Sequence, residues 1–225
     1  MAQAIDRPHS MIVAYQGLGF LYLRQGDVHQ AIPLLERGLE LCRAANISVW
    51  LPLVTAVLSA AYALSGRIAE ALPLLQQALE QTAAMRAPAY HQWRVVYWLS
   101  DAYPFAARSD EMLECLRRAV QLSRTYRERG TEAWALRLLG EIHTHQEPLD
   151  ATPAEDCYRE ALALASKLGM QPLLAHCHHG LGVLYHRTGR REEARFALSV
   201  AIKMYSEMKM VFWLIRAQVE LANAD

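Results

Sequence analysis

The sequence predicts an all-α protein: a right-handed α-solenoid of about five helix pairs followed by a C-terminal capping helix. The main observation is a signature that returns along the chain, in which leucine and a small residue are followed by an aromatic residue, a glycine and an alanine. Its leucines are Leu18, Leu58, Leu99, Leu139 and Leu181, and successive copies are 40, 41, 40 and 42 residues apart. One unit of this length cannot bury its own apolar face, so the units are expected to stack.

The spacing of the signature predicts one continuous array over residues 1–225 rather than separate domains. Its units span about residues 8–46, 47–87, 88–128, 129–169 and 170–209, and the capping helix spans residues 210–224. Each unit is expected to be two amphipathic helices joined by a short turn, which Gly26, Gly66 and Gly189 mark in three of the units. The capping helix carries Phe212 and Trp213, and it would cover the last apolar face of the array.

Both helices of a unit carry small residues where close packing needs them. In the first helix the aromatic residue lies four positions after the leucine and three after the small residue, so it shares one face with both. The small residue lets the paired helix approach closely. The second helices carry matching apolar sets, which are Ala31, Leu35 and Gly38; Ala71, Leu75 and Ala78; Met112, Leu116 and Ala119; Ala154, Tyr158 and Ala161; and Ala194, Leu198 and Ala201.

The fourth unit has a longer turn, from about residue 146 to residue 153, than the others. Thr152 precedes Pro153 there, and Glu155 follows three positions after the threonine. This arrangement is that of a capping box, so the next helix is expected to begin with Thr152 as its N-cap.

Composition excludes several classes of function. The formal net charge is +0, which provides no field for phosphate groups, so nucleic acid is not an expected partner. Residues 49–64 carry no charge, and a membrane span is the alternative to a covered central helix. Because this stretch contains Pro52 and keeps the repeat register, the covered helix is preferred and no membrane is expected.

The widely spaced cysteines Cys42, Cys115, Cys157 and Cys177 predict core thiols in a reducing, cytoplasmic compartment.

The signature resembles the tetratricopeptide repeat, whose pattern is a Leu-Gly pair, a tyrosine three positions after the glycine, a turn glycine and an opening alanine. Units one, two and five match this pattern well. Unit three has Ala107 in place of the turn glycine, and unit four has His143 in place of the tyrosine. The resemblance implies stacked helix pairs, and the period near 40 residues implies helices longer than those of the usual repeat.

The C-terminal part, residues 174–221, carries a second resemblance. Its motifs are Ala175-His176-Cys177-His178, Gly180-Leu181-Gly182, Gly189-Arg190, Glu193-Ala194-Arg195 and Met204-Tyr205. This part is similar to the helical-repeat tail of bacterial signalling proteins that carry a class III adenylate or guanylate cyclase domain and a signal-transducing ATPase domain. The resemblance implies a regulatory segment without its catalytic partners. No phosphate-binding loop occurs in the sequence, so no nucleotide activity is assigned to it.

The concave side of such an array is the expected binding surface, because the first helix of each unit lines it. The predicted groove residues are Phe20, Arg24, Arg94, Tyr97, Trp98, Asp101, Trp134, Arg137, Glu141, His176, His179, His186 and Arg187. Together they would form an aromatic, basic and histidine-rich surface. Such a surface suits an amphipathic helix or a peptide with an acidic end.

The histidines allow other hypotheses. His176 and His179 could supply two zinc ligands and His145 or His186 a third, but no carboxylate is placed to orient them, so no metal is expected. A pH-sensitive groove is the stronger idea, since ordinary histidines have a pKa of about 6.5. Catalysis is not expected, because no Gly-x-Ser-x-Gly elbow occurs and adjacent residues such as Cys177 and His178 point to different helix faces.

These observations favour a non-catalytic interaction module without a cofactor. It would bind a protein or peptide segment in the groove, or the cyclase and ATPase domains of the same parent protein. The alternative is a sensor that binds a small molecule or a signal peptide in the same groove. The exposed ends of an array would also allow two copies to pair as a homodimer.

Overall fold

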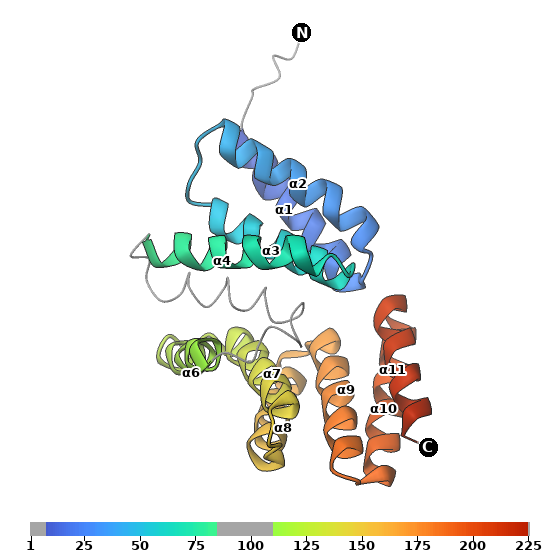
Figure 1. Cartoon of the computed structure of the whole chain (residues 1–225). Coiled ribbons are helices and arrows are strands. Elements are labelled where there is room, and N and C mark those ends of the chain that lie inside the picture. Colours follow the sequence, from blue (N-terminus) through green and yellow to red (C-terminus); the bar gives the residue numbers. More distant parts are fainter. Residues whose placement is uncertain (1–7, 85–109, 225) are drawn as a thin grey trace. The chain divides into compact units, whose positions relative to one another are not determined.

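The computed structural model describes residues 8–84 and 110–224, and every regular element in these ranges is an α-helix (Figure 1). The predicted all-α class with paired helices is therefore confirmed. The helices belong to two compact units, called unit 1 and unit 2, which are larger than the five repeats counted in the sequence. Unit 1 contains α1 (Pro8–Gln25), α2 (Val28–Ala44), α3 (Leu51–Leu64) and α4 (Ile68–Ala84). Unit 2 contains α6 (Asp110–Thr125), α7 (Arg129–His145), α8 (Ala151–Leu168), α9 (Gln171–Arg187), α10 (Arg191–Glu207) and α11 (Val211–Asn223).

In unit 1, α1 pairs with α2 and α3 pairs with α4, while α3 also packs on α2. The signature glycine permits the first of these contacts, because a Cβ at Gly19 would lie 2.6 Å from Leu35 Cγ. Helix α3 is buried from Pro52 to Ala63, which agrees with the expected covered helix. No helix in the described ranges has the length and apolar character needed to cross a membrane.

In unit 2, each helix from α6 to α11 packs on the next one along the chain. The same glycine position is used again, since a Cβ at Gly182 would lie 2.5 Å from Leu198 Cγ. The small and apolar sets expected on the second helices are buried wherever their side chains are described. The prediction of close helix approach at small residues is therefore confirmed in both units.

The turn glycines recur for a backbone reason. Gly26, Gly66 and Gly189 have φ angles of 81°, 83° and 75°, in the left-handed region that favours glycine. The N–H of the residue after each glycine then donates to the carbonyl of the signature tyrosine, at 2.9, 2.9 and 2.8 Å. This bond closes the first helix of each pair, so the tyrosine and glycine of the signature mark one helix end.

Two local expectations differ from the structure. The N-cap of α8 is Asp150 rather than Thr152, since Asp150 Oδ1 accepts a hydrogen bond from the Thr152 N–H at 3.2 Å. Leu18 is 48% exposed, whereas Leu58, Leu139 and Leu181 are buried. The buried leucines lie on helices that pack against the preceding helix, and among the described residues α1 follows no helix that could cover Leu18.

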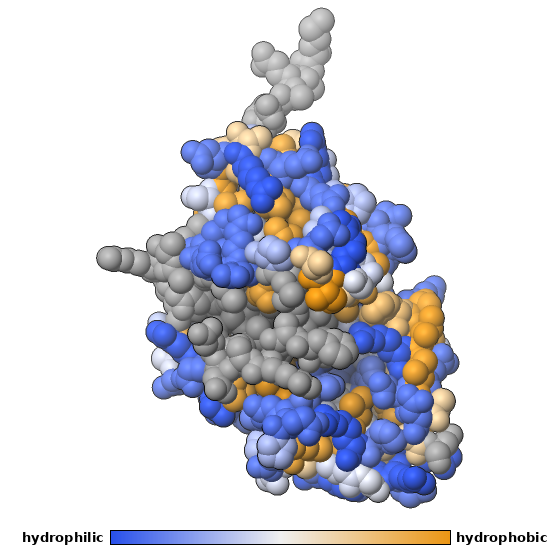
Figure 2. All heavy atoms as spheres, viewed as in Figure 1, coloured by the Kyte–Doolittle hydropathy of each residue, from blue (hydrophilic) through white to orange (hydrophobic). Residues whose placement is uncertain are grey.

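The last helix, α11, is apolar on both sides. Trp213 and Ala217 are buried as α11 packs on α10. Val211, Ile215 and Val219 are 58%, 54% and 54% exposed on its outer side, and Figure 2 shows a hydrophobic strip along this helix. The single array over residues 1–225 stays a prediction, because the third sequence repeat, residues 88–128, lies partly outside the described residues.

Candidate functional site

The predicted groove residues fall into three groups. Arg94, Tyr97, Trp98 and Asp101 lie outside the described residues. Phe20 and Arg24 lie one turn apart on α1 of unit 1, where the Arg24 guanidinium is 5.1 Å from the centre of the Phe20 ring. The remaining predicted groove residues lie on α7 and α9 of unit 2.

His176 is part of an aromatic cluster rather than an open surface. Its ring centre lies 5.8 Å from Trp134, 5.5 Å from Tyr205 and 4.8 Å from Trp213. His176 Nδ1 and the Tyr205 hydroxyl are 2.9 Å apart and share a hydrogen bond. Because His176 is only 2% exposed, it packs α9 against α10 and α11 and is not available to a partner.

Arg137 and Glu141 form an ion pair along α7. The Arg137 guanidinium and the Glu141 carboxylate are 2.7 Å apart, and the Arg137 side chain is 6% exposed. Burial of a guanidinium is costly unless a carboxylate neutralises it, and Glu141 provides that charge. Arg137 therefore does not offer the open positive charge that the predicted groove requires.

His179 does not titrate near neutral pH. Burial, followed by the positive charges of Arg216 and Arg137, lowers the pKa of His179 to about 3. Burial also lowers the pKa of His178. The lowered pKa values keep both histidines neutral near neutral pH, and His179 stays neutral down to about pH 3, so these two residues do not supply the charge that a pH-sensitive groove needs.

His186 and Arg187 end helix α9. Arg187 donates to the carbonyl of Thr144 and pairs with Glu147 at 2.5 Å, so it fastens the end of α9 to the residues around the end of α7. His186 is half-buried, and its Nδ1 has no hydrogen-bond partner among the described residues. No group of three histidine, cysteine, aspartate or glutamate residues that could hold a metal ion occurs in the described part of the chain.

Arg216 on α11 is a further basic residue that sequence reasoning missed. It is exposed, and its guanidinium lies 5.4 Å from the centre of the Phe212 ring and 5.8 Å from that of Trp213. A sequence signal existed, since Arg216 is the only charged residue between Lys209 and Glu220. We define the arginine–aromatic face as Trp134, His179, Phe212 and Arg216, which lie around the buried ring of Trp213.

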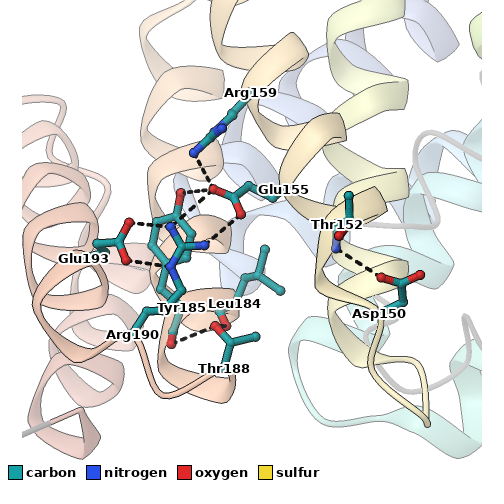
Figure 3. Close-up of polar contacts among 9 residues, drawn as sticks. All are labelled: Asp150, Thr152, Glu155, Arg159, Leu184, Tyr185, Thr188, Arg190 and Glu193. Carbon is teal, nitrogen blue, oxygen red and sulfur yellow. Dashed lines mark hydrogen bonds and ion pairs between the residues drawn. The ribbon is translucent and has the colours of Figure 1, made fainter.

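A second polar cluster joins α8, α9 and α10 (Figure 3). The Tyr185 hydroxyl donates to Glu155 at 2.8 Å, and the Arg190 guanidinium covers the Tyr185 ring at 4.1 Å. Figure 3 shows Arg190 between two carboxylates, Glu155 at 2.8 Å and Glu193 at 2.6 Å. Arg159 completes the cluster, 2.5 Å from Glu155. We call these residues the tyrosine–arginine clamp.

The same clamp occurs in unit 1. The Tyr62 hydroxyl donates to Glu36 at 2.6 Å, and the Arg67 guanidinium lies 3.9 Å from the centre of the Tyr62 ring. Arg67 also bonds Glu70 through its Nε at 2.7 Å. Since Tyr62, Arg67 and Glu70 stand at the repeat positions of Tyr185, Arg190 and Glu193, the clamp belongs to the scaffold that joins successive helix pairs.

Cys177 lacks the properties of a nucleophile. Its side chain is fully buried, and burial raises the pKa of the thiol to about 12. A reactive cysteine needs a lowered pKa and access to solvent. Cys177 is therefore a small apolar core residue between its histidine neighbours in the sequence.

Comparisons with known proteins agree with this architecture. A crystal structure from Pyrococcus horikoshii, of a Signal Transduction ATPase with Numerous Domains (STAND) protein with a tetratricopeptide repeat sensor, superposes with a TM-score of 0.64 at 17% identity. The match covers 98% of this chain and 33% of that one, so this chain spans about a third of that protein's length. At this identity the likeness shows the fold alone. No curated protein matches the sequence.

The sequence model of the tetratricopeptide repeat matches residues 10–83 and 150–207, which together are more than half of the chain. The unmatched residues 84–149 include the parts of units three and four where Ala107 and His143 replace signature residues. The matched segments carry the glycine contacts, the turn glycines and the tyrosine–arginine clamp described above. The chain belongs to the tetratricopeptide repeat family.

Proposed function

We propose that this chain is a non-catalytic protein-interaction module that binds a peptide or partner domain through unit 2. Its membership of the tetratricopeptide repeat family is the observation that carries the proposal, because such repeats generally mediate contacts between proteins. Stacked helix pairs offer extended surfaces for this purpose. The buried Cys177 thiol and the neutral, half-buried His179 add no group suited to chemistry.

The arginine–aromatic face is the surface we assign to the partner. Arg216 offers an exposed positive charge beside the rings of Phe212 and Trp213. Aromatic and arginine side chains are the residues that most often anchor protein interfaces. A helical segment with acidic and apolar residues matches this chemistry, since a carboxylate can pair with Arg216 while apolar side chains cover the half-buried Phe212 ring.

A place in a larger signalling protein is the finer part of the proposal. The similar Pyrococcus horikoshii protein is a STAND protein in which the tetratricopeptide repeats form a sensor, and this chain corresponds to about a third of it. The C-terminal motifs also resemble the repeat tails of cyclase–ATPase signalling proteins. The partner would then be a catalytic domain of the same parent protein, and the repeats would be one continuous array.

The second candidate is a sensor that binds a small molecule or a signal peptide on the same face. The description of the Pyrococcus horikoshii repeats as a sensor favours it. A sensor ligand would act by stabilising one of two arrangements of the array. Pairing of two copies through exposed helix faces such as that of α11 is compatible with either candidate.

The experiment is a fluorescence-anisotropy titration of the chain with a short labelled amphipathic peptide of leucine and glutamate. Arg216→Glu is expected to raise the dissociation constant about tenfold, because it replaces an attraction with a repulsion. The control is Arg118→Glu, the same change at an exposed position of α6. Equal affinity of the wild-type protein and Arg216→Glu, or an equal loss in both variants, would contradict the proposal.

A further inference from the structure

Unit 2 contains a hollow of about 360 Å³ between α9 and α10, separate from the arginine–aromatic face. Helix α9 contributes His178, Leu181 and Tyr185, and α10 contributes Glu192, Glu193, Phe196 and Ala197. Its floor is closed, since Leu181, Tyr185 and Ala197 are all less than 9% exposed. The entrance of the hollow is open to solvent, because the Phe196 side chain at its edge is 71% exposed.

The clamp holds two sides of this hollow in place. Tyr185 is fixed through its hydroxyl to Glu155 and through its ring to Arg190. Glu193 is held by the same Arg190 at 2.6 Å (Figure 3). A partner that enters the hollow therefore meets an ordered wall, which lowers the entropy cost of binding.

The charge that remains at the hollow is negative. Arg190 neutralises Glu193, whereas Glu192 has no ion pair with any described residue. Burial lowers the pKa of His178, so this histidine adds no positive charge near neutral pH. Arg191 and Arg195 lie on the same helix but do not line the hollow.

The residues that give the hollow its chemistry are not part of the repeated scaffold. At the positions of His178, Glu192 and Phe196, the second sequence repeat (residues 47–87, in unit 1 of the structure) carries Thr55, Ala69 and Pro73. Three clamp residues, by contrast, are the same at both places, since Tyr185, Arg190 and Glu193 correspond to Tyr62, Arg67 and Glu70. The exposed aromatic ring and the carboxylate of Glu192 are thus absent from the corresponding place in the second repeat.

We propose that the α9–α10 hollow is a second docking site, which takes a partner segment with a basic residue next to an apolar one. The apolar side chain fills the hollow against Phe196 and Leu181. The lysine or arginine one helical turn away pairs with Glu192. An acidic segment is rejected, because its carboxylate would face Glu192 and Glu193.

A labelled amphipathic peptide of leucine and lysine tests this site by fluorescence anisotropy against the whole chain. Glu192→Lys and Phe196→Ala are each expected to raise the dissociation constant about tenfold, the first by charge repulsion and the second by loss of an aromatic anchor. The matched control is Glu207→Lys at the exposed end of α10, which keeps wild-type affinity. Unchanged thermal midpoints show that the variants are folded.

Two results would overturn the proposal. One is equal binding of the leucine–lysine peptide to the wild-type protein, Glu192→Lys and Phe196→Ala. The other is an equal loss in Glu207→Lys, which would mean that the peptide responds to overall charge. Failure here is distinct from failure of the proposed function, because that test uses the acidic peptide and Arg216.

Discussion

Tyr185 is the residue through which α8, α9 and α10 are joined, because its hydroxyl bonds Glu155 and its ring lies under Arg190. Tyr185→Phe keeps the ring and removes one hydrogen bond to a carboxylate. A bond of this kind contributes about 1.5 to 3 kcal/mol. Since Arg159 and Arg190 still contact Glu155, we expect a loss of about 1 kcal/mol in the free energy of unfolding, measured by urea titration.

Tyr126→Phe is the control for that substitution, since Tyr126 is 64% exposed. It is expected to leave the urea midpoint unchanged. If both variants lose the same stability, the hydroxyl of Tyr185 contributes nothing specific and the clamp is only a surface ion pair.

His179 provides a pH-dependent prediction. Its pKa is lowered to about 3 in the folded chain, while an unfolded histidine has a pKa of about 6.5. Between these values the unfolded state binds a proton that the folded state does not bind, so stability falls as the pH is lowered from about 6.5. We expect His179→Gln to flatten the dependence of the thermal midpoint on pH in this window.

His29→Gln is the matched control, because His29 is exposed on α2. It should keep the wild-type dependence on pH. Identical slopes for wild-type protein and His179→Gln would show that His179 is solvated and titrates normally.

The role of a single residue was predictable from the sequence where the residue belongs to the repeated signature. It was not predictable where the role depends on packing against residues distant in the sequence. The signature tyrosines and turn glycines have the local roles that their spacing predicts. His176 and His179 also follow the repeat register, but the burial of His176 depends on Trp213 of α11 and Tyr205 of α10. No spacing within α9 reveals that these rings cover it.

At the scale of the element, glycines set how closely the helices pack. A Cβ at Gly180 would lie 2.4 Å from the ring of Tyr158, which is itself fully buried. Gly180→Ala is therefore expected to destabilise unit 2 by about 1 to 3 kcal/mol, because a rigid ring would have to move. The measurement is the urea midpoint followed by circular dichroism.

Gly17→Ala is the comparison for that variant. Nothing lies within 4 Å of a Cβ at Gly17, which is exposed on α1. It should gain up to about 1 kcal/mol from helix propensity. A stabilising Gly180→Ala would show that α8 and α9 lie farther apart than described.

Helix ends were less predictable than helix contacts. Thr152 and Asp150 are both good N-cap residues and lie two positions apart, so the local sequence supports either start of α8. The structure uses Asp150, and Pro153 then lies within the first turn, where proline is tolerated. Glu155, expected in a capping box, belongs to the clamp and bonds Tyr185 and Arg190 of the next pair instead.

At the scale of the whole molecule, the repeats define the fold and the differences between them carry the information about binding. The family match and the all-α helix pairs follow from the signature. The arginine–aromatic face and the α9–α10 hollow do not, because Arg216, Phe196 and Glu192 occupy positions that the signature leaves unspecified. Only the fold shows which of these side chains gather on one surface.

The two proposals together give unit 2 two binding surfaces of opposite charge preference. The direct measurement is anisotropy titration of wild-type protein, Arg216→Glu and Glu192→Lys with both the leucine–glutamate and the leucine–lysine peptide. We expect Arg216→Glu to weaken binding of the acidic peptide alone and Glu192→Lys to weaken binding of the basic peptide alone. If each variant affects both peptides equally, or neither peptide, the assignment of these two surfaces is wrong.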